Sequence, residues 1–414
     1  MASTRSAWLQ PPRLRTEDEE EEERERHATW YELFFDLVFV AAVSQLAAAL
    51  SREPTLAGFA RFAGLFVPIV WAWAGFAFYS NRFGTDDVIY RLVKALAMLA
   101  IAALAISVHS VMRGGHGAVT FAASFVATRA CLLALYVRAR RYVTGAGRRL
   151  IDIYLGGFSA GGGVWLISIA VAGPARYWLW AGALAFELAM PLFGWSVLGR
   201  VGRVVNASHI TERFGQFFII VLGESIVAVV AGIAGTHLTA AASAVATCGM
   251  VIGLCVWWIY FDLADTSVVG RGVLGLVFIY AHFPLLGGVA AVGAGIKIAI
   301  TQADAASLGA GARWAISGGL ACYLLSLALL HMGAEWTSLR DRAFLGRLVS
   351  AAVVTVLAAA GGGLAPVAFV AILTATLIAQ LLLELLTYPL GASSVWSPEA
   401  TPGAAPSSAP QPAI

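Results

Sequence analysis

The stretch ELFFDLVFV, from Glu32 to Val40, places two carboxylates at the start of a long hydrophobic segment. The stretch ERFGQFFIIVLGES, from Glu212 to Ser225, does the same in the second half of the chain. A carboxylate deep in a membrane-spanning helix costs roughly 2.5 to 3.5 kcal/mol on insertion scales, so it is normally kept only where it faces a packed interior or a wet cavity. These two segments are therefore the first candidates for a functional site within a membrane.

The composition excludes a soluble enzyme of this length. Of the 414 residues, 59% are hydrophobic and 12% are charged, whereas soluble domains carry about 25% charged residues. A bilayer core about 30 Å thick needs ~20 apolar residues per helix. That length predicts twelve spans, at residues 31–50, 56–80, 90–112, 117–139, 150–172, 175–198, 214–233, 239–262, 272–296, 308–332, 345–360 and 364–388. Because strand patterning is absent, the predicted fold is an all-α polytopic membrane protein.

The basic residues predict the orientation of the chain. If the N-terminus is cytoplasmic, twenty of the 27 Lys and Arg residues fall on the cytoplasmic side, six fall outside and Arg129 lies within a span. Cytoplasmic loops carry the excess of Lys and Arg in membrane proteins. With an even number of spans, both termini are expected in the cytoplasm of a multi-pass protein of the cell membrane.

The chain divides into four predicted regions. Residues 1–28 form an acidic arm and residues 391–414 a tail rich in Pro, Ala and Ser, both expected to be disordered. Residues 29–200 and 201–390 are two transmembrane halves of six spans each. Matching aromatic residues, Phe34-Phe35 before Trp71 and Phe217-Phe218 before Trp257, suggest that the halves are parallel repeats. Chance matches in a chain rich in tryptophan are the alternative.

The first motif offers both a structural and a functional interpretation. Thr29 and Glu32 have the spacing of a capping box, which would satisfy backbone N–H groups at the start of a helix. Asp36 lies one turn further along the same face. Its two interpretations are a functional carboxylate and a buried carboxylate paired with Arg129 or a helix end.

The second motif repeats this logic. Glu212, Gln216 and Glu224 fall at four-residue multiples, and twelve residues at 1.5 Å rise separate the two carboxylates by about 18 Å. Glu212 and Arg213 are interpreted as an interfacial pair. Glu224 lies near the middle of the membrane between small neighbours that permit a close helix or a water. A functional role is favoured for Glu224.

Four other polar residues are candidates for an ion or proton pathway. Glu187 precedes a proline that would bend its span. His282 has the chemistry of a proton shuttle, although a hydrogen-bonded packing histidine explains it as well. Asp262 and Asp265 end a span, where the helix dipole disfavours anions, and they are either cation ligands or solvated loop residues.

Arg129 has no acidic residue near it on its own predicted helix. Its partner must therefore come from another span, and Glu224, Glu187 and Asp36 are the candidates. The four cysteines show no close-spaced ligand pair, so no metal site is expected. No cofactor motif and no nucleic-acid partner is indicated; the expected partners are the lipid bilayer and an unidentified small-molecule or ion substrate.

Three ordered stretches carry a family resemblance: WYELFFDLVFVAAVSQLA from Trp30, WAWAGFAFYSNRFGTDD from Trp71 and HITERFGQFFIIVLGESIVAVVAG from His209. With them the chain resembles the bacterial low temperature requirement protein A family from about residue 28 to residue 388. The resemblance implies a polytopic inner-membrane protein associated by name with growth in the cold. It supplies no reaction, substrate or catalytic residue.

Two function classes follow. A secondary transporter or ion-translocating protein would use Asp36, Glu187, Glu224 and His282 as titratable groups. An intramembrane enzyme or sensor that acts on lipid would use polar groups near the cytoplasmic interface. The second class has less support, because no nucleophile elbow, zinc-binding helix or phosphate-binding loop is present. A structural scaffold explains the buried charges poorly.

Overall fold

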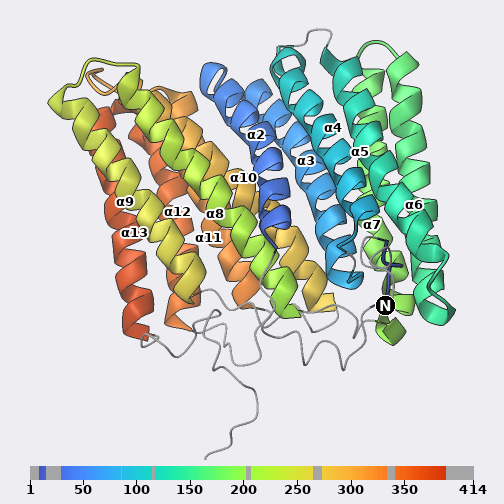
Figure 1. The fold of residues 1–414 in the computed structure, drawn as a ribbon. Coiled ribbons are helices and arrows are strands. Elements are labelled where there is room, and N and C mark those ends of the chain that lie inside the picture. Colours follow the sequence, from blue (N-terminus) through green and yellow to red (C-terminus); the bar gives the residue numbers. More distant parts are fainter. Residues whose placement is uncertain are drawn as a thin grey trace, which may run out of the picture.

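The structure is a computed structural model that describes residues 9–14, 29–84, 86–113, 117–201, 207–263, 273–332 and 341–387. Over these residues it consists of twelve long α-helices that run side by side, with no β-strand (Figure 1). Their bounds are α2 (Trp30–Arg52), α3 (Leu56–Arg82), α4 (Val88–Met112), α5 (Gly117–Arg140), α6 (Gly145–Ala170), α7 (Ala175–Val201), α8 (Ala207–Ala234), α9 (Ala240–Leu263), α10 (Val273–Thr301), α11 (Ala310–His331), α12 (Arg342–Ala360) and α13 (Pro366–Thr387).

The predicted all-α membrane fold is confirmed. Eleven of the helices are long and apolar enough to cross a membrane, judged on the described residues alone. The twelfth is α7, whose side chains from residue 193 onward are not described. Outward-facing side chains such as Leu99 (69% exposed) and Ile106 (79% exposed) are apolar, as a surface in contact with lipid requires.

One predicted boundary was wrong by a full two turns. The seventh span was expected to begin at residue 214, but α8 begins at Ala207 and includes Arg213. Because the prediction placed the charged Arg213 at the membrane surface, it began the span after this residue. The helix continues through this position because Arg213 is buried and paired, as described below.

Local sequence explains where several helices start. The side chains of Thr29, Thr55, Asp87 and Asp341 accept hydrogen bonds from backbone N–H groups in the first turns of α2, α3, α4 and α12. Such caps satisfy donors that the helix itself leaves free. They fix the start of each helix, and therefore the depth at which its polar side chains lie.

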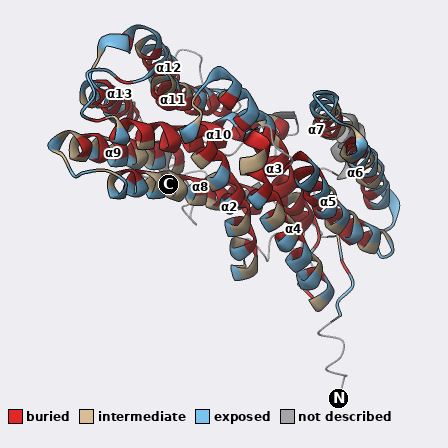
Figure 2. Ribbon diagram, turned by 90° about the horizontal axis from the view of Figure 1, so that it is seen from above, coloured by how far each residue is buried: buried red, intermediate tan, exposed pale blue. Residues whose placement is uncertain are grey.

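The core of the molecule is built around α3 and α10, the most deeply buried helices. Viewed from above, buried residues concentrate on these two helices and on the facing sides of α2 and α8, while α6 and α7 form one edge (Figure 2). A Cβ atom on Gly288 would lie 2.5 Å from the carbonyl oxygen of Gly319, so only glycine permits the close approach of α10 to α11 there.

The two halves pack in a similar order. In the first half α2 packs on α4, and the chain continues through the contacts α4 to α5, α5 to α6 and α6 to α7. In the second half α8 packs on α10, followed by α10 to α11, α11 to α12 and α12 to α13. The halves differ at α9, which packs closely on α13, whereas α3 barely touches α7. This shared order supports the predicted parallel duplication, which stays a prediction.

Part of the N-terminal arm contacts the helices. Leu14 forms an isolated bridge with Phe83 at the end of α3, and Arg138 of α5 donates a 2.6 Å hydrogen bond to the carbonyl oxygen of Gln10. The acidic run of the arm and the Pro/Ala/Ser tail lie outside the described residues.

Candidate functional site

Asp36 forms a fully buried ion pair between α2 and α8. Its Oδ1 accepts a 2.7 Å hydrogen bond from Arg213 Nη2 and a second, also 2.7 Å, from Trp73 Nε1 on α3. The other carboxylate oxygen, Oδ2, has no hydrogen-bond partner among the residues that the structure describes, and the same holds for Nε and Nη1 of Arg213. The pair therefore leaves much of its hydrogen-bonding capacity unused in a place that solvent does not reach.

The starts of the two helices bring this pair together. The capping box of Thr29 and Glu32 is present, so α2 begins at Trp30 and Asp36 is its seventh residue. Arg213 is likewise the seventh residue of α8, which begins at Ala207. The predicted surface pairing of Arg213 with Glu212 is corrected here, because Arg213 turns inward and is 0% exposed.

A buried lysine lies close to the pair. Lys94 of α4 is 0% exposed, and its Nζ donates a 3.2 Å hydrogen bond to the hydroxyl of Tyr90. The same Nζ lies 4.3 Å from the centre of the Phe35 ring, an arrangement that stabilises a cation through the face of the ring. Sequence reasoning counted Lys94 among the twenty basic residues of the cytoplasmic side and missed it as a member of the site.

Glu32 is the second acidic side chain of this cluster. Its Oε2 accepts a 3.1 Å hydrogen bond from the Thr29 backbone and lies 3.8 Å from Nε2 of His209 on α8. His209 in turn lies 3.3 Å from Nδ2 of Asn81 on α3. Two acidic side chains, Glu32 and Asp36, and two basic side chains, Arg213 and Lys94, are thus gathered with a histidine.

A second polar contact joins α2 and α8 deeper in the bundle. The hydroxyl of Ser44 donates a 2.7 Å hydrogen bond to Oε1 of Glu224. Ser44 lies eight residues after Asp36, which corresponds to about 12 Å along the helix. We call the interface formed by these cross-helix groups the α2–α8 seam; it comprises Glu32, Asp36 and Ser44 of α2 and His209, Arg213 and Glu224 of α8.

An apolar layer divides the seam. Val40 lies midway between Asp36 and Ser44 on α2 and is 4% exposed. On α8 the corresponding face carries Phe217, which is fully buried and stacks on Trp73 with ring centres 4.2 Å apart. The two polar levels of the seam are therefore separated by packed side chains rather than joined by an open channel.

A second buried carboxylate lies in the first half. Glu187 of α7 pairs with Arg129 of α5, and its Oε2 also accepts a 2.9 Å hydrogen bond from Trp71 Nε1. Of the three candidates for Arg129, the structure selects Glu187. Within the described part of the chain, Oε1 of Glu187 and Nε and Nη1 of Arg129 have no hydrogen-bond partner. Trp71 and Trp73 thus make α3 a shared donor to both buried carboxylates.

Glycine and proline shape the surroundings of Glu187. A Cβ atom on Gly161 of α6 would lie 2.3 Å from Oε1 of Glu187, so any larger residue would force the carboxylate to move. Pro191 lies within α7, four residues after Glu187. Because proline lacks an N–H group, it removes the helical hydrogen bond to the Glu187 carbonyl.

His282 is held at both ring nitrogens. Nδ1 lies 2.6 Å from the carbonyl oxygen of Phe278, and Nε2 lies 3.0 Å from the hydroxyl of Tyr260. The ring is fully buried and packs edge-on against Phe214. This geometry favours the packing interpretation of His282 over a proton shuttle.

The remaining candidates lie away from the seam contacts or outside the description. Gln216 donates a 3.1 Å hydrogen bond to Glu212, as the four-residue spacing allows, and its own Oε1 has no partner within the protein. The side chain of Asp262 is not described, and Asp265 lies wholly outside the described residues. Their predicted role as cation ligands stays a prediction.

A third buried ion pair was not predicted. Arg347 of α12 donates to both carboxylate oxygens of Glu384 on α13, at 2.9 and 2.7 Å, and its Nη1 donates to the Leu327 carbonyl at 3.2 Å. Gln380 donates a further 2.7 Å hydrogen bond to Glu384 and accepts one from Ser350. We call these groups the α12–α13 junction.

No metal centre is found in the part of the chain that the structure describes, since no three His, Cys, Asp or Glu side chains gather suitably there. The carboxylates of the seam are groups at which a proton or a small charged group can be exchanged. Sequence reasoning found the carboxylates, but it treated Trp71 and Trp73 only as aromatic landmarks and missed their role as donors.

Comparisons with known proteins agree with the resemblance in the sequence. A family model described as bacterial low temperature requirement A protein matches residues 27–382, which include every helix from α2 to α12 and most of α13. An uncharacterized protein of Rhizobium meliloti (strain 1021), RA0937, is 27% identical over 303 residues, which cover 70% of this chain and 71% of that protein.

Proposed function

The chain belongs to the family of bacterial low temperature requirement A proteins, and we propose that it is a secondary transporter or ion-translocating protein whose path follows the α2–α8 seam. The observation that carries the proposal is the incomplete pairing of Asp36 with Arg213 in a fully buried position. A buried polar atom without a partner costs about 1 to 3 kcal/mol. A protein that tolerates several such atoms at one place gains stability there when a proton, an ion or a polar solute binds.

The position of the seam supports the proposal. If the two halves are repeats, α2 and α8 are their first helices, and the seam is part of the interface between them, beside the packing of α2 on α10. Transporters built from repeats bind their substrates and coupling ions at the repeat interface, near the middle of the membrane. Asp36 and Glu224 lie on this interface at two depths, with donors from the opposite helix.

The apolar layer favours transport over an open pore. Val40 and Phe217 separate the level of Asp36 from that of Glu224. A charge cannot pass such a layer without rearrangement of the helices, because the cost of a charge among apolar groups is high. The proposed cycle therefore alternates between a state with Asp36 accessible and a state with Glu224 accessible.

The proposal includes an orientation. The excess of basic residues on one side predicts that both chain ends are cytoplasmic. Asp36, Glu32 and His209 then lie toward the cytoplasm, and Glu224 lies further from it. Thiol labelling of single cysteines, introduced in the loop at residues 304–306, tests this part in intact cells, where these positions should react with a reagent added outside.

The function is tested by electrical recording from proteoliposomes on a solid-supported membrane. The panel consists of pH steps, monovalent and divalent cations and small metabolites. We expect a transient current for one member of the panel, and we expect Asp36→Asn and Glu224→Gln to lose it while the proteins remain folded.

A matched control separates the seam from a general loss of carboxylates. Asp152 of α6 forms an exposed pair with Arg140, with 44% of its side chain exposed. Asp152→Asn should retain the wild-type current. Unchanged current in Asp36→Asn and Glu224→Gln, or silence of the folded wild type across the whole panel, would contradict the proposal.

A further inference from the structure

Five arginines and no acidic residue lie in the segment 138–149, where α5 ends and α6 begins. Two of the five are paired with acids from elsewhere, Arg138 with Asp87 and Arg140 with Asp152. The other three are exposed and form no ion pair with any residue that the structure describes. We call these three the basic turn; it comprises Arg141, Arg148 and Arg149.

Exposed arginines at other places in the bundle face an acid. Arg61 lies 3.0 Å from Glu53, and Arg91 lies 2.7 Å from Asp86. The preference for basic residues on the cytoplasmic side explains why arginines lie at this end of the helices. It does not explain why three of them gather without an acid, and their charge is complementary to an anionic partner.

The fold brings the three arginines to one place. Because α5 ends at Arg140 and α6 begins at Gly145, only residues 141–144 join the two helices. The N–H of Val143 donates a 3.1 Å hydrogen bond to the carbonyl oxygen of Ala139, and Gly145 has a φ of 64°, which favours glycine. Arg141 comes directly before this tight connection, and Arg148 and Arg149 follow in the first turns of α6.

The basic turn lies at the level of the lipid headgroups. With 26 residues at 1.5 Å each, α6 is about 39 Å long, which is about 9 Å more than the hydrocarbon core. Arg148 and Arg149 are its fourth and fifth residues. Because helical side chains tilt toward the N-terminus and long basic side chains extend out of the core, both guanidinium groups reach the headgroup region.

Lipid can reach this part of the molecule. α6 lies at one edge of the bundle (Figure 2), and it is the least buried of the eleven helices that are long and apolar enough to span a membrane. Its outward side chains Leu166 and Ile167 are 57% and 62% exposed. Tyr142, beside Arg141, is also strongly exposed, and tyrosine is common at the headgroup level.

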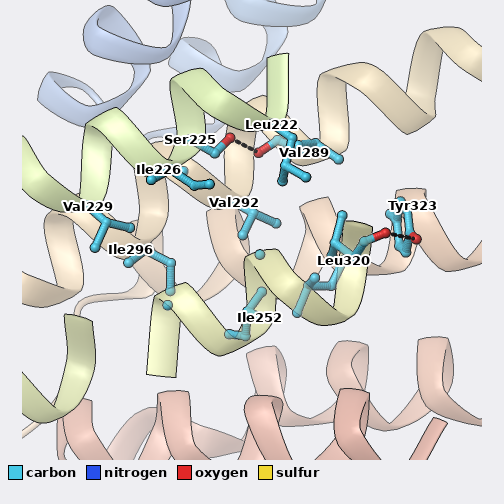
Figure 3. A pocket seen from close by; sticks show the side chains of 14 residues that line it. Leu222, Ser225, Ile226, Val229, Ile252, Val289, Val292, Ile296, Leu320 and Tyr323 are labelled. Atoms are coloured by element: carbon cyan, nitrogen blue, oxygen red, sulfur yellow. Dashed lines mark hydrogen bonds between the residues drawn. The ribbon is translucent and has the colours of Figure 1, made fainter. Parts of the chain in front are cut away.

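The small apolar hollow among α8, α9, α10 and α11 offers a charged ligand nothing comparable. Ser225 donates a 3.0 Å hydrogen bond to the carbonyl oxygen of Val289, and Tyr323 donates a 2.7 Å hydrogen bond to that of Val256 (Figure 3). Both hydroxyl groups are therefore used, and none of the residues that line the hollow is charged.

We infer that the basic turn binds the phosphate headgroup of an anionic phospholipid in the leaflet around this end of the helices. Guanidinium groups bind phosphate oxygens in pairs of charge-assisted hydrogen bonds, and basic segments beside spanning helices attract anionic lipids. The inference does not rest on the proposed transport function, because no residue of the seam belongs to the basic turn.

Such a lipid would hold α5 and α6 together. Arg141 follows α5, whereas Arg148 and Arg149 belong to α6, so one headgroup can contact both helices. Deeper in the membrane the same two helices carry Arg129 and Gly161, which lie against Glu187. The lipid therefore supports the packing around this buried pair from the headgroup level.

The test places the full chain in nanodiscs that contain equal amounts of phosphatidylglycerol and phosphatidylcholine. Native mass spectrometry then identifies the lipids that the released protein retains. We expect phosphatidylglycerol to be enriched among them for the wild type. The enrichment should decrease as sodium chloride is raised from 0.1 to 1 M, because the screening length falls from about 10 Å to about 3 Å.

Three triple variants make the test specific. Replacement of Arg141, Arg148 and Arg149 by Gln should abolish the enrichment, and each single replacement should lower it by up to about fivefold, the factor that one arginine contributes near an anionic surface. The same three changed to Lys keep the charge and should retain most of the enrichment. Replacement by Gln of three exposed arginines away from the turn, Arg52, Arg113 and Arg342, removes the same charge and should leave the enrichment unchanged.

Three outcomes would overturn the inference. Retained lipids in the proportion of the mixture would show that the wild type has no preference for an anionic headgroup. Equal losses in the two Gln triple variants would show an effect of net charge rather than a site. Enrichment that appears only after removal of residues 1–28 would show that the acidic run of the chain, rather than a lipid, neutralises these arginines in the intact protein.

Discussion

The α2–α8 seam and the α12–α13 junction each bury an arginine beside a carboxylate, yet they differ in how completely these groups are paired. At the junction, all three guanidinium nitrogens of Arg347 and both oxygens of Glu384 have protein partners. At the seam, one oxygen of Asp36 and two nitrogens of Arg213 have none. Both pairs are almost fully buried.

Because the two pairs are equally buried but differ in how completely they are hydrogen-bonded, buried charge alone is a poor sign of function. A buried ion pair is stable when further hydrogen bonds satisfy its remaining donors and acceptors, and the junction meets that condition. Buried polar groups without partners are uncommon in proteins, so their concentration at the seam, and equally at the pair of Arg129 with Glu187, requires a separate explanation. We assign a structural role to the junction, and we propose a functional role for the seam.

The largest effect on stability is expected at the junction. Arg347→Met leaves the buried Glu384 without its cation, which should lower the free energy of unfolding by about 3 to 5 kcal/mol. Thermal unfolding in detergent measures the change. Arg342→Met, at an exposed position of the same helix, should stay within about 0.5 kcal/mol of the wild type. Equal effects of the two variants would refute the structural role of the junction.

A smaller loss of stability is expected at the seam. Asp36→Asn keeps an oxygen that accepts from Trp73 and Arg213, and Glu32 remains nearby as a counter-charge, so the loss should be about 1 to 3 kcal/mol. The same unfolding assay, run beside Arg347→Met, gives the ranking. If Asp36→Asn lowered the free energy of unfolding more than Arg347→Met did, the distinction between a functional ion pair and a structural one would be contradicted.

The pair of Arg129 with Glu187 resembles the seam in its unpaired atoms, and a glycine substitution tests how tightly it is held. Gly161→Ala places a Cβ 2.3 Å from Oε1 of Glu187, so the carboxylate must move, at a cost of about 1 to 3 kcal/mol. Gly163→Ala on the same helix meets open space and should be neutral or slightly stabilising. Indistinguishable unfolding temperatures for the two variants would show that Glu187 is free to shift.

The smallest effect is expected at the start of α2. Thr29→Ala removes the capping hydroxyl, which typically lowers stability by about 1 kcal/mol. The ion pair of Asp36 is not touched by this change, so any current found for the wild type should persist in proteoliposomes. Loss of that current in the folded variant would mean that the helix start, rather than the pair, controls the seam.

Hydrophobic length predicted the twelve helices because the bilayer core imposes the same length on every span. Charge placement was harder to predict. The expected start of α8 lay after Arg213, because the sequence does not show that an aspartate from a distant helix receives this arginine. The capping box of Thr29 was predictable, since both of its members lie within one turn.

The partners within the bundle could not be predicted from the sequence. Three acids were equally available to Arg129, and only the packing of α5 on α6 and of α6 on α7 brings Glu187 to it. The burial of Lys94 was not predicted because it depends on rings from other positions, among them Phe35. Trp71 and Trp73 became recognisable as donors only when α3 was placed between the two carboxylates.

The most direct test of the account is infrared difference spectroscopy on proteoliposomes during a pH step or substrate exchange. The carboxyl stretching region reports protonation and changes of hydrogen bonding at individual acids. We expect a difference band in the wild type that disappears in Asp36→Asn and persists in Asp152→Asn. No band in the wild type during measurable transport, or a band that survives in folded Asp36→Asn, would contradict the central claim that the seam carboxylate takes part in the cycle.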